Sequence, residues 1–271
     1  MRTPTPCNNP AVMIKKTSSL GTLLIKPIPK TDAKVMIVAN HYSHKWNDGG
    51  FGVYNIGVFR LEQPDTCLGV AVYGYMKTPK ARIFTHPNPN AWMCELNRLW
   101  ISDELGKNAE TVLISCSIKL LKKIDPNIVA VQSFADGRLG CGTIYKAANF
   151  RYYGYHYTRF LRNRKTGEVV HEQILTNTTC TAGYLRTNIG YLIGDFEVFA
   201  VKTYRYIYPL SERFVFCKKE RPYPPYEKGE MPVEWVRNRQ KIKENIIRLL
   251  DRVAAYKSPK TPQIITIICL F

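Results

Sequence analysis

Polar side chains follow a short apolar run near the middle of the sequence. The run IVAVQ at residues 128–132 is rich in β-branched residues and is typical of a buried strand. Ser133 and Asp136 come directly after it, before a glycine-rich turn. Ligands of α/β sheets bind outside the carboxyl ends of the strands, so a carboxylate here could accept a proton from an amine nucleophile. Asp136 is therefore a candidate general base; the alternative is that Asp136 starts the turn and Ser133 caps it.

A second candidate site lies at the end of a helix predicted for residues 31–40. His41 and His44 are three residues apart, which suits one face of a helix. They could ligate a metal or hold an acceptor base. The alternative is that they are surface residues stabilised by the negative end of the helix dipole.

A third candidate is the turn before a helix predicted for residues 109–124. A helix that begins after a glycine turn offers free N–H groups and a positive dipole end to a phosphate. Gly106 is the glycine of this turn, and Asn108 stands at its end. The alternative is an ordinary left-handed turn before a capped helix.

Arginine, lysine and tyrosine alternate densely over residues 151–165 and again over residues 202–208. Basic side chains neutralise phosphates, and aromatic rings stack on exposed bases. Tyrosine-rich strands can also simply cover a sheet face. Since the chain of 271 residues has a net charge of +18, we favour binding to nucleic acid.

Composition also argues against several classes of protein. No signal peptide and no apolar run long enough to cross a bilayer is visible, so we expect a cytoplasmic protein with no membrane partner. The eight cysteines form no C-x-x-C pair, which argues against a zinc ribbon or finger. We expect Cys94, Cys116 and Cys141 to be small buried residues in a reducing compartment.

Hydrophobic periodicity predicts the elements that position these residues. The expected order, by residue range, is helix 31–40, strands 51–61, 68–75 and 91–101, helix 109–124, strand 128–132, helix 143–149, and strands 150–162 and 195–210. Glu95 and Arg98 should lie on opposite faces of their strand, because they are three residues apart. The predicted fold is α+β: a mixed central sheet flanked by helices, with a C-terminal helical extension.

The chain also divides into three segments by composition. Residues 1–30 read as an irregular arm, residues 31–220 as one catalytic domain, and residues 221–271 as a basic linker, an amphipathic helix and a tail. The amphipathic helix is expected from Pro232 to Tyr256.

The order and spacing of several short motifs resemble the phage Mom family of DNA-adenine modification proteins, which are similar to GNAT acyltransferases. The motifs are HYS at 41–43, CELNRLW at 94–100, SCS at 115–117, VQSFAD at 131–136, GTIYKAANF at 142–150 with Gly154, and KTYRYIYP at 202–209. Members convert the exocyclic amine of adenine in DNA to a carbamoylmethyl derivative and so protect phage DNA from restriction. The resemblance implies a GNAT-like fold, double-stranded DNA as the partner, and this reaction in the cytoplasm of a phage-infected bacterium.

The resemblance also implies roles for particular residues. The implied catalytic residues are Asp136, Ser133, Tyr145, Glu95 and Arg98. The implied donor-binding residues are Leu96, Leu99, Gly106, Lys107, Asn108, Ala109, Ser117 and Asn149. The implied DNA-binding residues are Tyr42, Lys45, Arg151, Tyr153, Tyr155, Arg159, Lys202 and Arg205. Iron would be held by His41 and Tyr42, with Asp136 as a third ligand.

Other readings stay open from the sequence. The donor is either an acyl-coenzyme A or a glycyl-tRNA, so charged tRNA is a second candidate partner. A homodimer is a further expectation. The alternative functions are a GNAT N-acetyltransferase that acts on a protein or small-molecule amine, and a non-catalytic DNA-binding protein.

Overall fold

The structure is a computed structural model that describes residues 12–78, 82–171, 196–226, 233–235, 240 and 243–248. Its chain divides into two compact units. Unit 1 comprises Met1–His156 and Lys202–Met231, and unit 2 comprises Tyr157–Val201 and Pro232–Phe271. This division differs from the three segments expected from composition. Among the described residues, no helix has the length and apolar character needed to cross a membrane.

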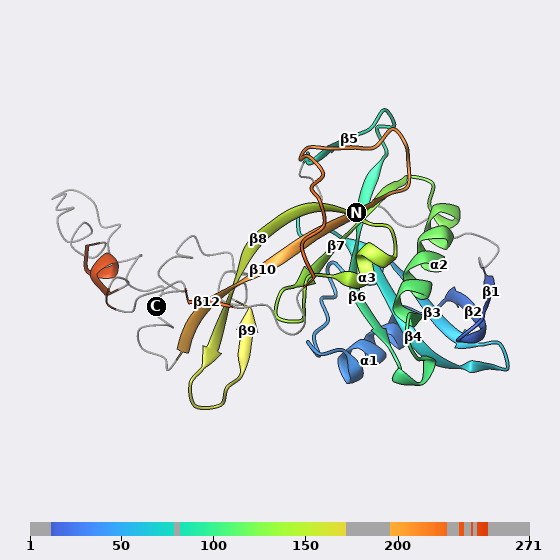
Figure 1. Ribbon diagram of the computed structural model, residues 1–271, viewed down its shortest axis with the longest axis horizontal. Coiled ribbons are helices and arrows are strands. Elements are labelled where there is room, and N and C mark those ends of the chain that lie inside the picture. The colour runs from blue at the N-terminus through green and yellow to red at the C-terminus, as the bar shows by residue number, and fades with distance from the viewer. Residues whose placement is uncertain are drawn as a thin grey trace, which may run out of the picture. The chain divides into compact units, whose positions relative to one another are not determined.

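The described residues form a mixed sheet with helices packed on it (Figure 1). The elements are β1 (Met13–Thr17), β2 (Gly21–Pro27), α1 (Lys30–Asn40), β3 (Tyr54–Arg60), β4 (Gln63–Tyr75), β5 (Phe84–Thr85), β6 (Trp92–Ile101), the 3-10 helix η1 (Asp103–Leu105), α2 (Ala109–Ile124), β7 (Ile128–Asp136), α3 (Thr143–Ala147), β8 (Arg151–Asn163), β9 (Val169–His171), β10 (Phe196–Pro209), β11 (Val215–Phe216) and β12 (Glu234–Trp235). The strand order is β1-β2-β3-β4-β6-β7-β10-β8-β9. The predicted α+β fold is thereby confirmed.

The predicted helices and most predicted strands are present within a few residues of their expected bounds. The N-terminal region is a correction. Strands β1 and β2 form an antiparallel hairpin that pairs with β3, so residues 13–27 are not an irregular arm. Residues 1–11 of the predicted arm lie outside the described residues. The expected burial of Cys94, Cys116 and Cys141 is confirmed.

Two hydrophobic clusters cover the two faces of unit 1. Along β4, Ala71 and Tyr73 belong to the large cluster that includes most buried residues of α2. The alternate residues Val70 and Val72 pack with α1 instead. Successive side chains of a strand point to opposite faces, so α2 covers one face of the sheet and α1 covers the other. We call these the α2 face and the α1 face.

The parallel pair β6 and β7 stays together over only part of its length. The two strands are paired from Trp92↔Ile128 to Glu95↔Gln132. Beyond this point β6 continues beside β4, and β7 continues beside β10. The neighbouring strands therefore part after Glu95 and Gln132, and the backbone of residues 96–101 is not paired with β7.

A β-bulge in β6 changes which side chains share a face. The register of β4 with β6 shifts between Val72↔Arg98 and Tyr73↔Leu96, so Asn97 is an additional residue in β6. Before the bulge Leu96 packs on the α2 face, and after it Leu99 does. The extra residue breaks strict alternation. The prediction of opposite faces for Glu95 and Arg98 is thus wrong, because it assumed an unbroken period of two.

Unit 2 holds the ends of β8 and β10 that lie beyond unit 1, with β9 and β12. Residues 243–248 are helical, and Ile246 packs against Leu161 and Val198. The predicted helix from Pro232 to Tyr256 is therefore wrong at its start, where β12 pairs with β10. Its last residues lie outside the described part of the chain.

We predict that Gly74→Ala destabilises unit 1. A Cβ at Gly74 would lie 2.0 Å from the Gly50 carbonyl oxygen and 2.5 Å from Asn97 Oδ1, so the loop before β3 must move away from β4. Overpacking of this kind costs about 1–3 kcal/mol of the free energy of unfolding, which denaturant titration measures. Gly49→Ala is the matched control, because its Cβ would approach the nearest atom only to 3.6 Å. Equal stabilities of the two variants would contradict the close approach.

Candidate active site

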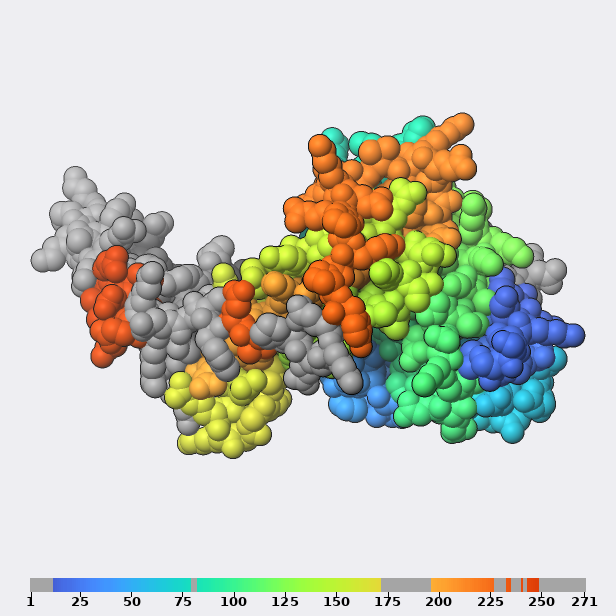
Figure 2. Space-filling model, in the orientation of Figure 1, coloured from blue at the N-terminus to red at the C-terminus, as the bar shows by residue number. Residues whose placement is uncertain are grey.

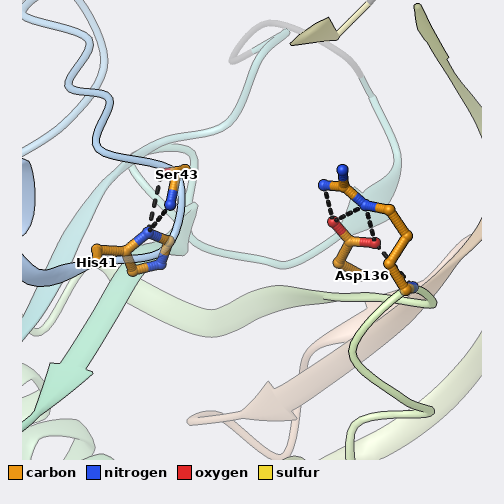
Figure 3. Close-up of polar contacts among 4 residues, drawn as sticks. His41, Ser43 and Asp136 are labelled. Atoms are coloured by element: carbon orange, nitrogen blue, oxygen red, sulfur yellow. Dashed lines mark hydrogen bonds and ion pairs between the residues drawn. The ribbon is translucent and has the colours of Figure 1, made fainter. Parts of the chain in front are cut away.

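Asp136 ends β7 and is held by an arginine two residues later. The guanidinium of Arg138 donates to both carboxylate oxygens over 2.5–3.1 Å, and the Arg138 backbone N–H donates to Oδ1 at 3.0 Å (Figure 3). Both side chains are largely buried, at 15% exposure for Asp136 and 27% for Arg138. Charge-assisted, forked contacts of this kind fix the direction of a carboxylate. Asp136 is therefore held in one orientation at the strand end.

Tyr42 brings an exposed aromatic ring to the same place. The side chain is 57% exposed, yet burial of its hydroxyl raises the pKa, and the negative charge of Asp136 raises it further. The positive charges of Arg98 and Arg138 act in the opposite direction. The Tyr42 hydroxyl thus responds to the charges of Asp136, Arg98 and Arg138. Arg98 Nε also donates to the Lys45 carbonyl at 3.4 Å, which joins the loop that carries Tyr42 to β6. The Tyr42 ring contacts the His41 ring with centroids 4.3 Å apart, and its exposed surface is what stacking on a base would require.

Glu95 supplies a second carboxylate at the point where β6 and β7 part. The Gln132 amide donates to Glu95 Oε2 at 2.9 Å, and the Asn97 amide donates to Oε1 at 3.2 Å. Burial raises the pKa of the Glu95 carboxyl, against the effect of these two hydrogen bonds. A carboxyl whose pKa moves toward neutrality is suited to general acid–base chemistry.

Both amides turn their N–H groups to Glu95, and their oxygens therefore point away from it. An ionised carboxylate only accepts hydrogen bonds, so this orientation is forced. The buried Gln132 Oε1 and Asn97 Oδ1 have no hydrogen-bond partner among the described residues. Asn97 Oδ1 lies against Gly74, whereas Gln132 Oε1 is an acceptor for a donor from a ligand or water.

Arg98 lies on the same side as Glu95 because of the bulge. Its Nη1 donates to the Asn97 carbonyl at 2.7 Å, and its guanidinium carbon lies 4.6 Å from the centre of the Phe51 ring. Burial lowers the pKa of Arg98, while Tyr42 and Glu95 raise it. A half-buried guanidinium beside two acidic groups can stabilise an oxyanion or a phosphate.

Ser133 and Tyr145 lie on the other face of β7. Tyr145 belongs to the cluster of the α2 face and hydrogen-bonds with the Ser133 side chain. Burial raises the pKa of Tyr145 to about 12. The Ser133 hydroxyl donates to the Leu96 carbonyl at 3.4 Å, across the opening between the strands. By strand register Glu95, Arg98 and Asp136 lie on the α1 face, whereas Ser133 and Tyr145 lie on the α2 side of β7. The negative charges of Tyr42 and Glu95 still raise the pKa of Tyr145, so its hydroxyl faces the same opening from the α2 side.

His41 ends α1 as a buried, neutral residue. Its Nδ1 accepts the Ser43 backbone N–H at 3.1 Å and lies 2.8 Å from the Ser43 hydroxyl (Figure 3). Burial lowers the pKa of His41 to about 4, and the charges of Arg98 and His44 lower it further in the same direction. Because Nδ1 accepts the backbone N–H, the ring proton of neutral His41 is on Nε2. His44 instead bonds to the Val38 carbonyl at 2.9 Å and closes the end of α1.

The expected iron ligands do not form a metal site in this arrangement. Asp136 is engaged by the Arg138 guanidinium, whose charge opposes a cation at the same oxygens. The free nitrogen of His41 carries a proton when Nδ1 accepts from Ser43. Among the described residues, no three His, Cys, Asp or Glu side chains are grouped so that they could hold a metal ion. We therefore derive no step through iron.

The expected donor-binding residues fall into three places. Gly106, Lys107 and Asn108 form an exposed turn, with φ of 79° at Gly106 and 70° at Asn108, before Ala109 begins α2. Leu96 and Leu99 line β6 where it has left β7, and their side chains pack on the core. Asn149 follows α3 with φ of 62°.

Ser117 is a correction to the donor-binding set. It is fully buried, donates to the Ile114 carbonyl at 3.0 Å and lies 2.5 Å from the Tyr73 hydroxyl. Its polar group is thus satisfied inside the core, where a cofactor cannot reach it. The short SCS motif did not show which of its serines faces inward.

The expected DNA-binding residues are dispersed. Lys45 is exposed beside Tyr42, Arg151 pairs with Glu220 at 3.8 Å, and Tyr155 lies beneath the Lys202 ammonium at 5.0 Å. The remaining three are Tyr153, which packs edge-on against Phe216; Arg205, which stacks on Phe134 and Phe216; and Arg159, which is exposed in unit 2.

Other tyrosines of the same stripe are not available to DNA. Tyr152, Tyr204 and Tyr206 are buried in the core of the α2 face. Alternate positions of a strand face opposite sides, so the basic and aromatic residues of 151–165 and 202–208 form two sets, of which one packs inward.

Sequence reasoning missed several residues of the site. Arg138, Asn97 and Gln132 hold the two carboxylates, yet none was singled out. The D-G-R order after β7 was a usable signal for Arg138, because an Asp side chain at a turn often binds groups two residues later. Nothing in the local sequence pointed to Gln132, whose role depends on its pairing with Glu95 across two strands.

The fold is an α+β fold in which a mixed sheet opens between two parallel strands, and acid–base side chains gather at the opening. The sequence model of the Mom protein family matches residues 22–225. The chain therefore belongs to the Mom protein family.

Known relatives agree with this assignment. The methylcarbamoylase Mom of Escherichia phage Mu is 32% identical over 204 residues, which cover 71% of this chain and 79% of that protein. Among solved structures, Arabidopsis thaliana NAA60 in complex with acetyl-CoA has a TM-score of 0.43 and 10% identity, over 69% of this chain and 99% of the other. The ribosomal-protein-S5-alanine acetyltransferase of Vibrio fischeri has a TM-score of 0.39 and 10% identity, over 74% and 98%. The family assignment rests on the sequence matches.

We predict that His41 makes stability depend on pH. Its pKa is lower in the folded chain, so protonation favours the unfolded state; the stabilisation is present above about pH 6.5 and is lost as the pH falls toward about 4. Between about pH 7 and about pH 5 this group should remove about 2 kcal/mol from the free energy of unfolding. Denaturant titration should show this fall in the wild type and not in His41→Gln. His44→Gln, the control on the same loop, should keep it, and an equal fall in all three proteins would contradict the prediction.

Proposed function

We propose that this chain converts the exocyclic amine of adenine in double-stranded DNA to a carbamoylmethyl derivative. The observation that carries the proposal is the Asp136 carboxylate, which the Arg138 guanidinium orients at the end of β7 and whose charge acts on the exposed Tyr42 side chain. A base acceptor needs a stacking face and a proton acceptor in one place, and this pair supplies both. The name of the phage Mu relative, methylcarbamoylase, indicates the transferred group.

The α1 face suits the requirements of the acceptor amine. The N6 lone pair is delocalised into the adenine ring, so attack on a carbonyl needs a base to take its proton. Asp136 and Glu95 are the two candidates for this base, and their environments suit them to different roles. Glu95 has a raised pKa in a buried setting, whereas Asp136 is fixed by Arg138 and is best suited to accept a hydrogen bond from N6.

The opening between β6 and β7 suits the donor. The backbone of residues 96–99 is free of β7, so its N–H and C=O groups can bind an extended donor arm. Arg98 would stabilise the oxyanion that forms when N6 attacks the donor carbonyl. The unpartnered Gln132 Oε1 is an acceptor for an N–H group of the donor or of adenine.

Of the two donors, we favour glycyl-tRNA over an acyl-coenzyme A. A glycyl group on N6 carries a free amine that can attack adenine C6 through a five-membered ring. The former N6 then leaves C6 and remains on the carbonyl as the amide nitrogen, and the product is the carbamoylmethyl derivative. No atom is lost after the first transfer and no oxidant is needed. The net charge of +18 also suits a polyanionic donor.

Two other proposals accompany this function. The modification would protect phage DNA from restriction in the cytoplasm of the infected bacterium. A GNAT N-acetyltransferase that acts on another amine is the second candidate, and the glycine turn before α2 favours it, because a helix N-terminus can bind the pyrophosphate of coenzyme A. Activity without DNA distinguishes it from the first.

We predict that Asp136→Asn strongly reduces modification of DNA in cells that express the protein. Loss of a base or hydrogen-bond acceptor for N6 should lower the yield of modified deoxyadenosine by about 100-fold or more. Nucleosides from digested DNA are separated and weighed by mass spectrometry. When the cells are fed isotopically labelled glycine, the new nucleoside should carry more label than unmodified deoxyadenosine from the same DNA, whose purine ring also takes up glycine atoms.

The matched control is Asp65→Asn, an exposed carboxylate in the β4 strand that is distant in sequence from the site. It should leave the yield within about twofold of wild type, as surface changes usually do. If soluble, abundant wild-type protein yields only normal nucleosides, the proposed function is wrong. A modified nucleoside with no more label than unmodified deoxyadenosine would keep the function and exclude glycyl-tRNA as the donor.

A further inference from the structure

An exposed leucine stands at the tip of the loop that follows β7. Leu139 is 60% exposed, while most large aliphatic side chains of unit 1 are buried. It follows Asp136 by three residues and is flanked by Gly137 and Gly140. At Gly140, where φ is 119°, a Cβ would meet no atom within 4 Å, so the space around this tip is open. Leu139 therefore adds little to the core.

The loop that carries Leu139 is held by four short contacts. The Gly137 N–H donates to the Lys202 carbonyl at 2.9 Å, and the Leu139 N–H donates to the Asp136 carbonyl at 2.9 Å. Arg138 binds the Asp136 carboxylate with both its backbone N–H and its guanidinium. An apolar side chain is thus presented to solvent on an ordered turn, next to the carboxylate of the site.

Reaction at adenine N6 would give an exposed apolar side chain beside the site a use. Adenine N6 is paired inside duplex DNA, so the base must turn out of the stack before it can react. The gap that it leaves is costly, because the neighbouring bases lose their stacking partner. DNA-binding proteins fill or open such steps with an apolar side chain, leucine among them.

We propose that Leu139 is a wedge that enters the base stack and fills the gap left by the extruded adenine. This inference rests on the proposed function and adds the way in which the duplex is opened. The Leu139 N–H donates to the Asp136 carbonyl at 2.9 Å, so the wedge and the candidate proton acceptor belong to one turn. The fork between Arg138 and Asp136 keeps the wedge at a fixed distance from the proton acceptor.

The test compares paired and unpaired adenines in one DNA. Purified protein is incubated with a clarified bacterial lysate as the source of donor and with linearised plasmid DNA, either native or heat-denatured and rapidly chilled. Modified deoxyadenosine is measured by mass spectrometry. Leu139→Ala should lose about tenfold on native DNA and stay within about twofold of wild type on denatured DNA, because only the native form requires base extrusion. Leu139→Met, which keeps a long apolar side chain, should retain activity on both forms.

Ile14→Ala is the matched control. Ile14 is 59% exposed and lies in β1, the edge strand at the end of the sheet away from β7. It should act like wild type on both forms of DNA. Equal loss for Leu139→Ala on both forms, or no loss on either, overturns the wedge while leaving the proposed function in place. A wild type that modifies native but not denatured DNA also overturns the wedge, and a wild type that modifies neither form overturns the proposed function itself.

Discussion

The separation of β6 from β7 is the constraint on which the rest of the site depends. Two parallel strands normally share hydrogen bonds along their whole length, but these two are paired only as far as Glu95 and Gln132. The bulge at Asn97 then turns Arg98 to the same face as Glu95. The bulge in turn requires a glycine at position 74, because the Asn97 side chain and the Gly50 carbonyl occupy the space of a Cβ. The arrangement of the candidate site thus begins with backbone pairing and not with any single reactive side chain.

Charge balance explains why this opening can hold two acidic groups. Three arginines balance the two carboxylates. The charges of Arg98 and Arg205 act on Glu95, and Arg138 forms an ion pair with Asp136. Arg205 also stacks on the Phe134 ring. Buried carboxylates without such partners would be strongly destabilising. The segments around β5 and β11 pair with each other and lie together in Figure 2. Phe216 of β11 contacts Arg205, with its ring centroid 5.6 Å from the guanidinium carbon.

Most of the fold of unit 1 could be predicted from periodicity, because α2 and the buried strands have long, regular apolar patterns. The hairpin of β1 and β2 could not, since its edge strand carries lysines and threonines that resemble a loop composition. Asp136 and Tyr42 were found as single residues, but their partners were not: Arg138 acts through a turn, and Gln132 acts through pairing between strands that are far apart in sequence. The bulge at Asn97 also left no trace in the hydrophobic periodicity. The prediction that Glu95 and Arg98 lie on opposite faces was wrong for this reason.

The measurement that tests this account most directly is a crystal structure of the protein with a short adenine-containing DNA duplex. The account predicts that one adenine is turned out of the helix, stacks on the Tyr42 ring, and directs N6 to the Asp136 carboxylate on the α1 face. The donor opening beside residues 96–99 would then lie next to N6. A base bound on the other face, beside Ser133 and Tyr145, or a duplex bound with every base still stacked, would contradict it.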